Sequence, residues 1–192
     1  MTIRLVLLHG WGANGDDLRP LGEQLAQRTS APLETICLEA PERHPGQPGG
    51  RQWYGLFPSD WDAVPEAVNR LRSALLTLEG GEAALRRTVL FGFSQGGAMA
   101  LDCGCSLPLA GIISCSGYAH PAWEPPADHP PVLLLHGTED CVVPFQAMAE
   151  IQNRLDSERC ETVPFQNGHT IPVETMQPIL NFLQRGGEQR GI

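Results

Sequence analysis

The 192-residue sequence predicts an α/β fold in which a mostly parallel sheet of about six strands carries helices on both faces. Two observations lead to this prediction. Short apolar, β-branched runs recur along the chain, and segments with helical periodicity lie between them. The runs are nearly continuous in apolar character, which is typical of strands covered on both sides. The length and the 42% hydrophobic content are expected to give one domain, residues 1–192.

The strands and helices follow from these patterns in chain order. Six strands are predicted at Ile3–Leu8, Leu33–Leu38, Thr88–Phe91, Gly111–Cys115, Val132–His136 and Cys160–Pro164. Helices are predicted at Asp16–Gln27, Pro65–Leu78, Gly97–Leu107, Phe145–Leu155 and Val173–Leu183. Connections of these lengths indicate right-handed crossovers between parallel strands. The tail Gly186–Ile192 is expected to fray.

Two long connections are rich in proline, Pro41–Gly50 and Pro121–Pro131. Neither is long enough to form a linker or an inserted cap domain. We therefore expect an open site, unless the region Pro41–Asp60 folds over it. An aromatic cluster, Trp53, Tyr54, Phe57 and Trp61, follows the first of these connections.

Composition and charge exclude several classes of protein. The net charge is −9 and the 13 basic residues are scattered, which argues against binding of nucleic acid or of anionic membranes. The six cysteines lack zinc-ligand spacing and are expected to be buried free thiols. Met1–Leu8 is too short for a signal-peptide core, and no stretch approaches the roughly 20 apolar residues of a membrane span. The sequence therefore predicts a cytoplasmic protein.

The segment Gly92–Gly96, with the sequence Gly-Phe-Ser-Gln-Gly, carries the strongest functional signal. It follows an apolar strand and opens a helix, so Ser94 is expected on a tight strand-to-helix turn with its hydroxyl above the sheet edge. Glycine at both ends of the segment avoids a collision across the turn. The same pattern arises by chance, but its place between a strand and a helix favours a nucleophile.

A serine nucleophile needs a base and an orienting carboxylate. Asp140 follows the strand Val132–His136, and His169 lies in a turn after Cys160–Pro164, so both are predicted at the same sheet edge as Ser94. Glu139 is a competing carboxylate, and Asp140 as a simple helix cap is the alternative for that residue. The other histidines are interpreted as structural or exposed: His9, His44, His120, His129 and His136.

The loop Leu8–Gly15 contains three glycines and is expected to supply a hydrogen-bond donor for an oxyanion. Trp11 is the predicted donor there, together with the backbone N–H of Gln95 after the nucleophile. A phosphate-binding loop is the alternative, but the glycine spacing and the missing Lys-Ser/Thr pair disfavour it.

These residues together resemble the phospholipase/carboxylesterase family, which includes the acyl-protein thioesterases. The resemblance rests on segment 8–12 (Leu-His-Gly-Trp-Gly), on 50–54 (Gly-Arg-Gln-Trp-Tyr), on 92–101, on 116–118 and on 136–144. It implies an α/β-hydrolase fold without a cap domain, and a serine esterase of short-to-medium acyl groups that uses no cofactor and no metal.

The same resemblance assigns the triad roles to Ser94, Asp140 and His169 and the oxyanion hole to Trp11 and Gln95, and it places Trp53 and Tyr54 near the acyl pocket. The chain departs from the family pattern in two places. It starts almost at the strand before His9, so the strands that precede it in the fuller fold are expected to be short or absent. Trp11 replaces a smaller apolar residue, which is expected to narrow the acyl channel.

The predicted function is therefore a serine hydrolase that cleaves esters or thioesters of small molecules or acyl carriers through an acyl-enzyme. Two alternatives stay open from the sequence: a lactonase that uses the same triad, and a non-catalytic ligand-binding protein built on a hydrolase scaffold. A peptidase is disfavoured because 192 residues leave no room for the extra domains that such enzymes carry.

Overall fold

The computed structural model describes residues 2–188 and contains one six-stranded sheet in the order β2-β1-β5-β6-β7-β8, every neighbouring pair of which is parallel. The strands are β1 (Ile3–Leu8), β2 (Leu33–Leu38), β5 (Thr88–Phe93), β6 (Gly111–Cys115), β7 (Val132–Gly137) and β8 (Cys160–Phe165). A separate two-stranded antiparallel pair consists of β3 (Glu42–Arg43) and β4 (Arg51–Gln52). The strand predictions are confirmed to within two residues at each end.

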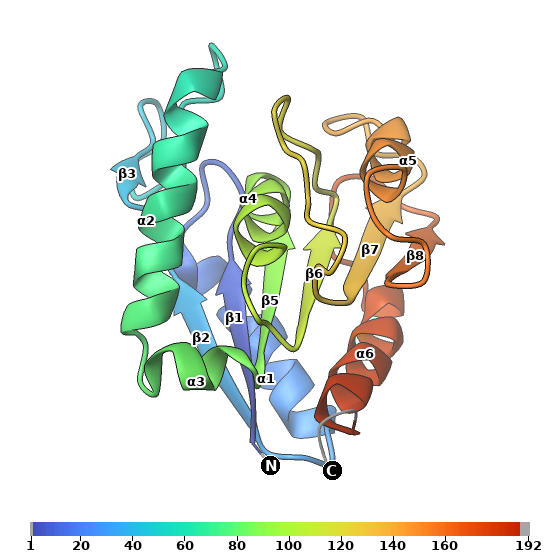
Figure 1. Cartoon of the computed structure of the whole chain (residues 1–192). Helices are drawn as coiled ribbons and strands as arrows, with labels where there is room; N and C mark the ends of the chain where they lie inside the picture. Colours follow the sequence, from blue (N-terminus) through green and yellow to red (C-terminus); the bar gives the residue numbers. More distant parts are fainter. Residues whose placement is uncertain (1, 189–192) are drawn as a thin grey trace.

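Helices cover both faces of the sheet (Figure 1). Helix α1 (Arg19–Arg28) and α6 (Met176–Glu188) lie on one face; α2 (Val64–Thr77), α3 (Gly81–Leu85), α4 (Gln95–Gly104) and α5 (Gln146–Gln152) lie on the other. Three short 3-10 helices complete the set: η1 (Gly15–Leu18), η2 (Trp61–Ala63) and η3 (Val173–Thr175).

The core explains why β1 is apolar at every position except Arg4, which is buried and paired with Glu34. Val6 and Leu8 belong to the hydrophobic cluster beneath α2, α4 and α5, while Leu5 and Leu7 belong to the cluster beneath α1 and α6. Successive side chains of a strand point to opposite faces, so a strand between two helical layers carries apolar residues on both faces.

Several predictions outside the main sheet need correction. The segment predicted as one helix at Asp16–Gln27 is divided into η1 and α1, because Asn14 caps the first and Pro20 stands in the first turn of the second. Helix α3 and the strands β3 and β4 are absent from the sequence prediction because each is too short to show a period. At the other end of the chain, α6 continues to Glu188 with Gly186 lying against Ala110. The helix therefore extends two residues past Gly186, the predicted start of the frayed tail; the fraying stays a prediction, and residues 189–192 lie outside the described part.

All six cysteines are free, but they are not all buried. Cys103, Cys105 and Cys115 lie in the core, whereas Cys141 is exposed beside the site described below. The prediction of buried thiols is wrong for Cys141, because it lies on the surface loop that follows β7. Among residues 2–188, no helix has both the length and the apolar character needed to cross a membrane.

Candidate active site

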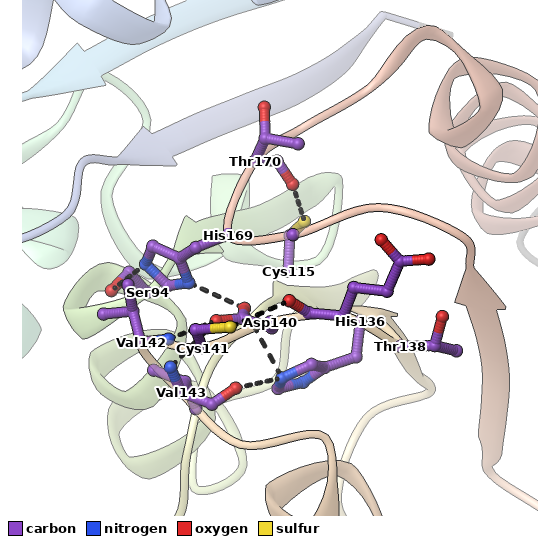
Figure 2. A network of polar contacts seen from close by, with 12 residues as sticks. Ser94, Cys115, His136, Thr138, Asp140, Cys141, Val142, Val143, His169 and Thr170 are labelled. Atoms are coloured by element: carbon purple, nitrogen blue, oxygen red, sulfur yellow. Dashed lines mark hydrogen bonds and ion pairs between the residues drawn. The ribbon is translucent and has the colours of Figure 1, made fainter.

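Three side chains from three different strand ends meet at the carboxyl edge of the sheet (Figure 2). Ser94 directly follows β5, Asp140 follows β7 and His169 follows β8. His169 Nε2 lies 2.9 Å from Ser94 Oγ, and His169 Nδ1 lies 2.7 Å from Asp140 Oδ2. The structure thus brings together the three residues predicted to form a triad, at distances suited to proton transfer from Ser94 to the imidazole.

The backbone at Ser94 is held in an unusual conformation. Its φ is 54° and its ψ is −118°, a region that a residue with a side chain rarely adopts. The turn closes only because its ends are glycines. A Cβ on Gly92 would lie 2.0 Å from the Gly96 carbonyl oxygen, and a Cβ on Gly96 would lie 2.2 Å from the Leu8 carbonyl oxygen. The strained turn leaves the Ser94 side chain partly exposed above the sheet.

Asp140 uses its two carboxylate oxygens for different partners. Oδ2 accepts from His169, while Oδ1 accepts the backbone N–H groups of Val142 and Val143, each at 2.9 Å. Burial acts to raise the pKa of Asp140, but the hydrogen bonds from His169 and from the two N–H groups outweigh it and hold the pKa below its ordinary value. Asp140 thus fixes the loop after β7 and contacts the histidine, but it caps no helix, since α5 begins at Gln146 with Phe145 as its N-cap. The competing carboxylate, Glu139, is exposed.

His136 lies on the far side of the same carboxylate, 3.7 Å from Asp140 Oδ2. Its Nε2 also lies 2.9 Å from the carbonyl oxygen of Val143, which can only accept, so Nε2 carries the hydrogen. Burial lowers the pKa of this histidine. A neutral His136 helps to fix the loop that carries Asp140, in line with the structural interpretation from the sequence.

The glycine-rich loop after β1 passes beside the serine: a Cβ on Gly10 would lie 3.3 Å from Ser94 Cβ. His9 fixes the orientation of this loop. Its Nε2 accepts the Ala40 N–H at 3.0 Å, so its hydrogen is on Nδ1 and is donated to the Gly10 carbonyl oxygen at 2.8 Å. Burial lowers the pKa of His9, which keeps the ring neutral. In a trans peptide the N–H points opposite to the C=O, so His9 sets the direction of the Trp11 N–H.

Gln95 is the first residue of α4, where a backbone N–H has no partner within the helix. Its side chain bonds a neighbouring segment, because Oε1 accepts the Trp53 N–H at 3.1 Å and Nε2 donates to the Tyr54 carbonyl at 2.8 Å. Gln95 therefore ties the nucleophile turn to segment 53–54. The assignment of Trp11 and Gln95 as oxyanion donors stays a prediction.

A cavity of about 470 Å³ opens beside Ser94 and His169. Most of its wall is apolar, and its further lining residues are Trp11, Leu56, Phe57, Ser59, Trp61, Tyr118, Val142, Val143, Pro144, Gln146, Ala147 and Glu150. The predicted placement of Trp53 and Tyr54 in the pocket needs correction, since neither lines the cavity. Both are buried behind it, where the Trp53 indole donates to the His9 carbonyl and Tyr54 contacts Tyr118.

The region Pro41–Asp60 forms part of the cavity wall, so the expectation of a fully open site is revised. Leu56, Phe57 and Ser59 line the same cavity as Ser94. Phe57 is 74% exposed, and its ring meets that of Trp11 edge-on at 5.1 Å between centroids. The large side chain of Trp11 donates a hydrogen bond to Gln52 at 3.0 Å and lines the cavity; its narrowing of the channel stays a prediction.

Several of these cavity residues carry no signal in the sequence. Leu56, Val142 and Ala147 are ordinary apolar residues, and only the fold shows that they face a cavity rather than the core. Phe57 and Trp61 are visible in the sequence as part of an aromatic cluster, but no pattern assigns them to the pocket. Within residues 2–188, no group of three or more His, Cys, Asp or Glu residues is arranged to hold a metal ion.

Comparison with known proteins gives a consistent picture. The family model described as phospholipase/carboxylesterase matches residues 2–186. An acyl-protein thioesterase 1 of Yarrowia lipolytica is 28% identical over 208 residues, covering 95% of this chain and 91% of that protein. A protein of the same name from Neurospora crassa is 28% identical over 218 residues, covering 95% and 86%.

Solved structures agree with this result. The crystal structure of esterase PE8 is 30% identical with a TM-score of 0.78, and the match covers 95% of this chain and 91% of that one. The structure of Arabidopsis thaliana SOBER1 shares the fold, with 24% identity and a TM-score of 0.80 over 98% and 100% of the two chains. The α/β-hydrolase fold predicted from the sequence is thereby confirmed.

Proposed function

Because the chain belongs to the phospholipase/carboxylesterase family and is a carboxylic ester hydrolase, we propose that it works through an acyl-enzyme on Ser94, with His169 as base and Asp140 as orienting carboxylate. The single observation that carries this proposal is the unbroken line of hydrogen bonds from Asp140 Oδ2 through the imidazole to Ser94 Oγ, at 2.7 and 2.9 Å.

The proposed reaction has two halves. His169 takes the Ser94 proton as Oγ attacks the acyl carbon, and Asp140 holds the ring in the tautomer that leaves Nε2 free to accept that proton. The N–H groups of Trp11 and Gln95 stabilise the negative oxygen of the tetrahedral intermediate. His169 then protonates the departing alcohol or thiol, and a water molecule, deprotonated by the same imidazole, releases the acyl group as a carboxylic acid.

The proposed substrates are esters or thioesters of short-to-medium acyl groups. The mostly apolar cavity beside Ser94 supports an acyl chain, and its volume of about 470 Å³ lies in the range of small-molecule sites. The two thioesterase relatives support a thioester as one substrate class. Phe57 and Trp11 form the part of the wall that is expected to limit chain length.

We place the protein in the cytoplasm as one domain over residues 1–192, acting on small molecules or acyl carriers without a cofactor. Six free cysteines support a reducing compartment. The net charge of −9 supports neither nucleic acid nor an anionic membrane as a partner.

A panel of nitrophenyl esters, acyl-CoA thioesters and acyl-peptide thioesters of increasing chain length tests this function. We expect turnover of at least one series, and a loss of about a thousandfold or more in Ser94→Ala. Ser73→Ala, which changes an exposed serine on α2, is the matched control and should retain turnover. Turnover that survives in Ser94→Ala contradicts the proposal, and the absence of turnover together with tight ligand binding favours the non-catalytic alternative.

A further inference from the structure

A second line of hydrogen bonds starts in α4 and ends at Tyr118, a residue that lines the cavity, and the proposed triad does not use it. Asp102 Oδ2 lies 2.6 Å from His120 Nδ1, His120 Nε2 lies 2.8 Å from the Tyr54 hydroxyl, and that hydroxyl lies 2.5 Å from the hydroxyl of Tyr118. His120 and Tyr54 are buried, while Tyr118 is half-buried and lines the cavity together with Ser94. We call this line the Asp102 relay.

The rings of the relay are held in place by packing. The Tyr54 ring meets the His120 ring edge-on at 5.3 Å between centroids, and Trp61 stands edge-on to Tyr118 at 6.4 Å. Tyr54 is also tied through its carbonyl oxygen to the side chain of Gln95, next to the nucleophile. The Tyr118 hydroxyl therefore has a fixed position relative to Ser94, which a specificity-determining group requires.

The relay has a direction when His120 is neutral. A carboxylate has no hydrogen to donate, so Nδ1 donates to Asp102, and Nε2 is left to accept. Tyr54 then donates its only hydrogen to Nε2, and Tyr118 donates its only hydrogen to Tyr54. Burial raises the pKa of Tyr118 to about 12 and also raises that of Tyr54, so both phenols keep their hydrogens at neutral pH.

The surroundings of His120 fix its place in the relay. Its ring is buried, and Arg154 donates to its carbonyl oxygen at 3.2 Å. Its partner Asp102 has a side chain that is 23% exposed.

We propose that Tyr118 is a specificity-determining residue whose oxygen accepts a hydrogen bond from the substrate. With His120 neutral, the Tyr118 hydrogen is taken up by Tyr54, so the Tyr118 oxygen keeps a lone pair for a substrate bound in the cavity that this residue lines. The matching substrate carries a hydroxyl or amide N–H near the scissile ester, in the acyl chain or in the leaving group. Asp102, His120 and Tyr54 act as positioning residues, which set the direction of the relay. This inference rests on the proposed serine hydrolase function.

The test uses sets of three nitrophenyl or alkyl esters of equal chain length. One member carries a hydroxyl, the second carries the same oxygen as a methyl ether, and the third carries neither. One set places the group in the acyl chain and another in the alcohol. The quantity measured is the ratio of kcat/KM for the hydroxyl ester to that for the methyl ether, because this ratio responds to donor recognition and not to general damage.

In at least one set we expect the wild-type ratio to favour the hydroxyl ester by about tenfold. Tyr118→Phe removes the accepting oxygen and should bring the ratio close to one. His120→Phe removes the acceptor that orients Tyr54 and should lower the ratio at least about threefold. Ser73→Ala is the matched control: this hydroxyl is exposed on α2 and does not line the cavity, so its loss should leave the ratio unchanged.

Three outcomes overturn the inference: a wild-type ratio near one in both sets, a ratio that Tyr118→Phe leaves unchanged, or a wild-type preference for the methyl ether that Tyr118→Phe abolishes. If Tyr118→Phe brings the ratio to one while His120→Phe keeps the wild-type ratio, the role of the relay is overturned. The ester without a hydroxyl or a methyl ether distinguishes failure of the specificity proposal from failure of the proposed hydrolase function. If the wild-type protein does not hydrolyse even that ester, the hydrolase proposal fails; if it does, only the specificity proposal is at stake.

Discussion

Replacing Asp140 by asparagine changes one atom of the carboxyl group and tests the direction of the proton transfers. In the wild-type protein Oδ1 accepts two backbone N–H groups at 2.9 Å, and Oδ2 accepts Nδ1–H of His169 at 2.7 Å. If the asparagine carbonyl keeps the two N–H donors, its NH2 group faces Nδ1. The imidazole hydrogen then moves to Nε2, where it faces Ser94 and prevents the ring from accepting the serine proton.

The other orientation of the amide restores the productive tautomer at a calculable cost. With the carbonyl turned to His169, the N–H groups of Val142 and Val143 lose their acceptor. The Val143 donor is buried, and leaving it unsatisfied costs about 1–3 kcal/mol, whereas Val142 is 68% exposed and its N–H can be hydrated. At about 1.4 kcal/mol per factor of ten, only a minority of molecules adopts that orientation, so kcat/KM should fall between about fivefold and about 140-fold.

Steady-state hydrolysis of a nitrophenyl ester, with circular dichroism as a check on folding, measures this effect. Glu139→Gln is the matched control: it makes the same chemical change at the neighbouring exposed carboxylate and should keep its activity within about twofold. A folded Asp140→Asn protein with activity close to wild type refutes the tautomer argument. A large loss in Glu139→Gln instead assigns the carboxylate role to Glu139.

Three further predictions concern the support of the site. His9→Phe removes the donor that orients the Gly10 carbonyl and should lower kcat by about tenfold or more with little change in KM; an unchanged kcat in a folded variant contradicts the role of His9. Gly92→Ala places a Cβ 2.0 Å from the Gly96 carbonyl oxygen and should lower the melting temperature sharply. In Gly46→Ala the nearest atom to the new Cβ is His44 Cε1 at 3.7 Å, so the melting temperature should not change. Equal melting temperatures in the two variants refute the packing argument. Because folding lowers the pKa of Asp140, its carboxylate stabilises the fold above about pH 4 and loses this effect as the pH falls through the lower folded value. The wild-type advantage in melting temperature over Asp140→Asn should therefore shrink in acid, and an advantage that grows there contradicts the sign of the shift.

The sheet was predictable because each strand carries its own signal. β1, β2 and β6 begin and end at the predicted residues, since strands covered by helices on both faces are mostly apolar. Ser94, Asp140 and His169 were predictable for a related reason, because parallel strands bring all their carboxyl ends to one edge. Local sequence and topology together were enough to place these three residues at that edge.

The cavity and the Asp102 relay were not predictable in this way. Trp53 and Tyr54 stand next to Leu56 and Phe57, yet the first two are buried and the second two line the cavity. Which of these residues are buried and which line the cavity depends on how the irregular segment after β4 packs against α4. No periodic sequence pattern predicts this packing. The relay likewise joins Asp102 and His120 from separate elements, and neither belongs to a local motif.

The most direct test of the central claim is intact-mass analysis after reaction with a fluorophosphonate, followed by mapping of the modified peptide. A serine activated by His169 and Asp140 predicts one adduct per chain, located on Ser94 and absent from the Ser94→Ala protein. Failure to form the adduct on folded protein, or an adduct that persists in Ser94→Ala, contradicts the claim that Ser94 is the nucleophile.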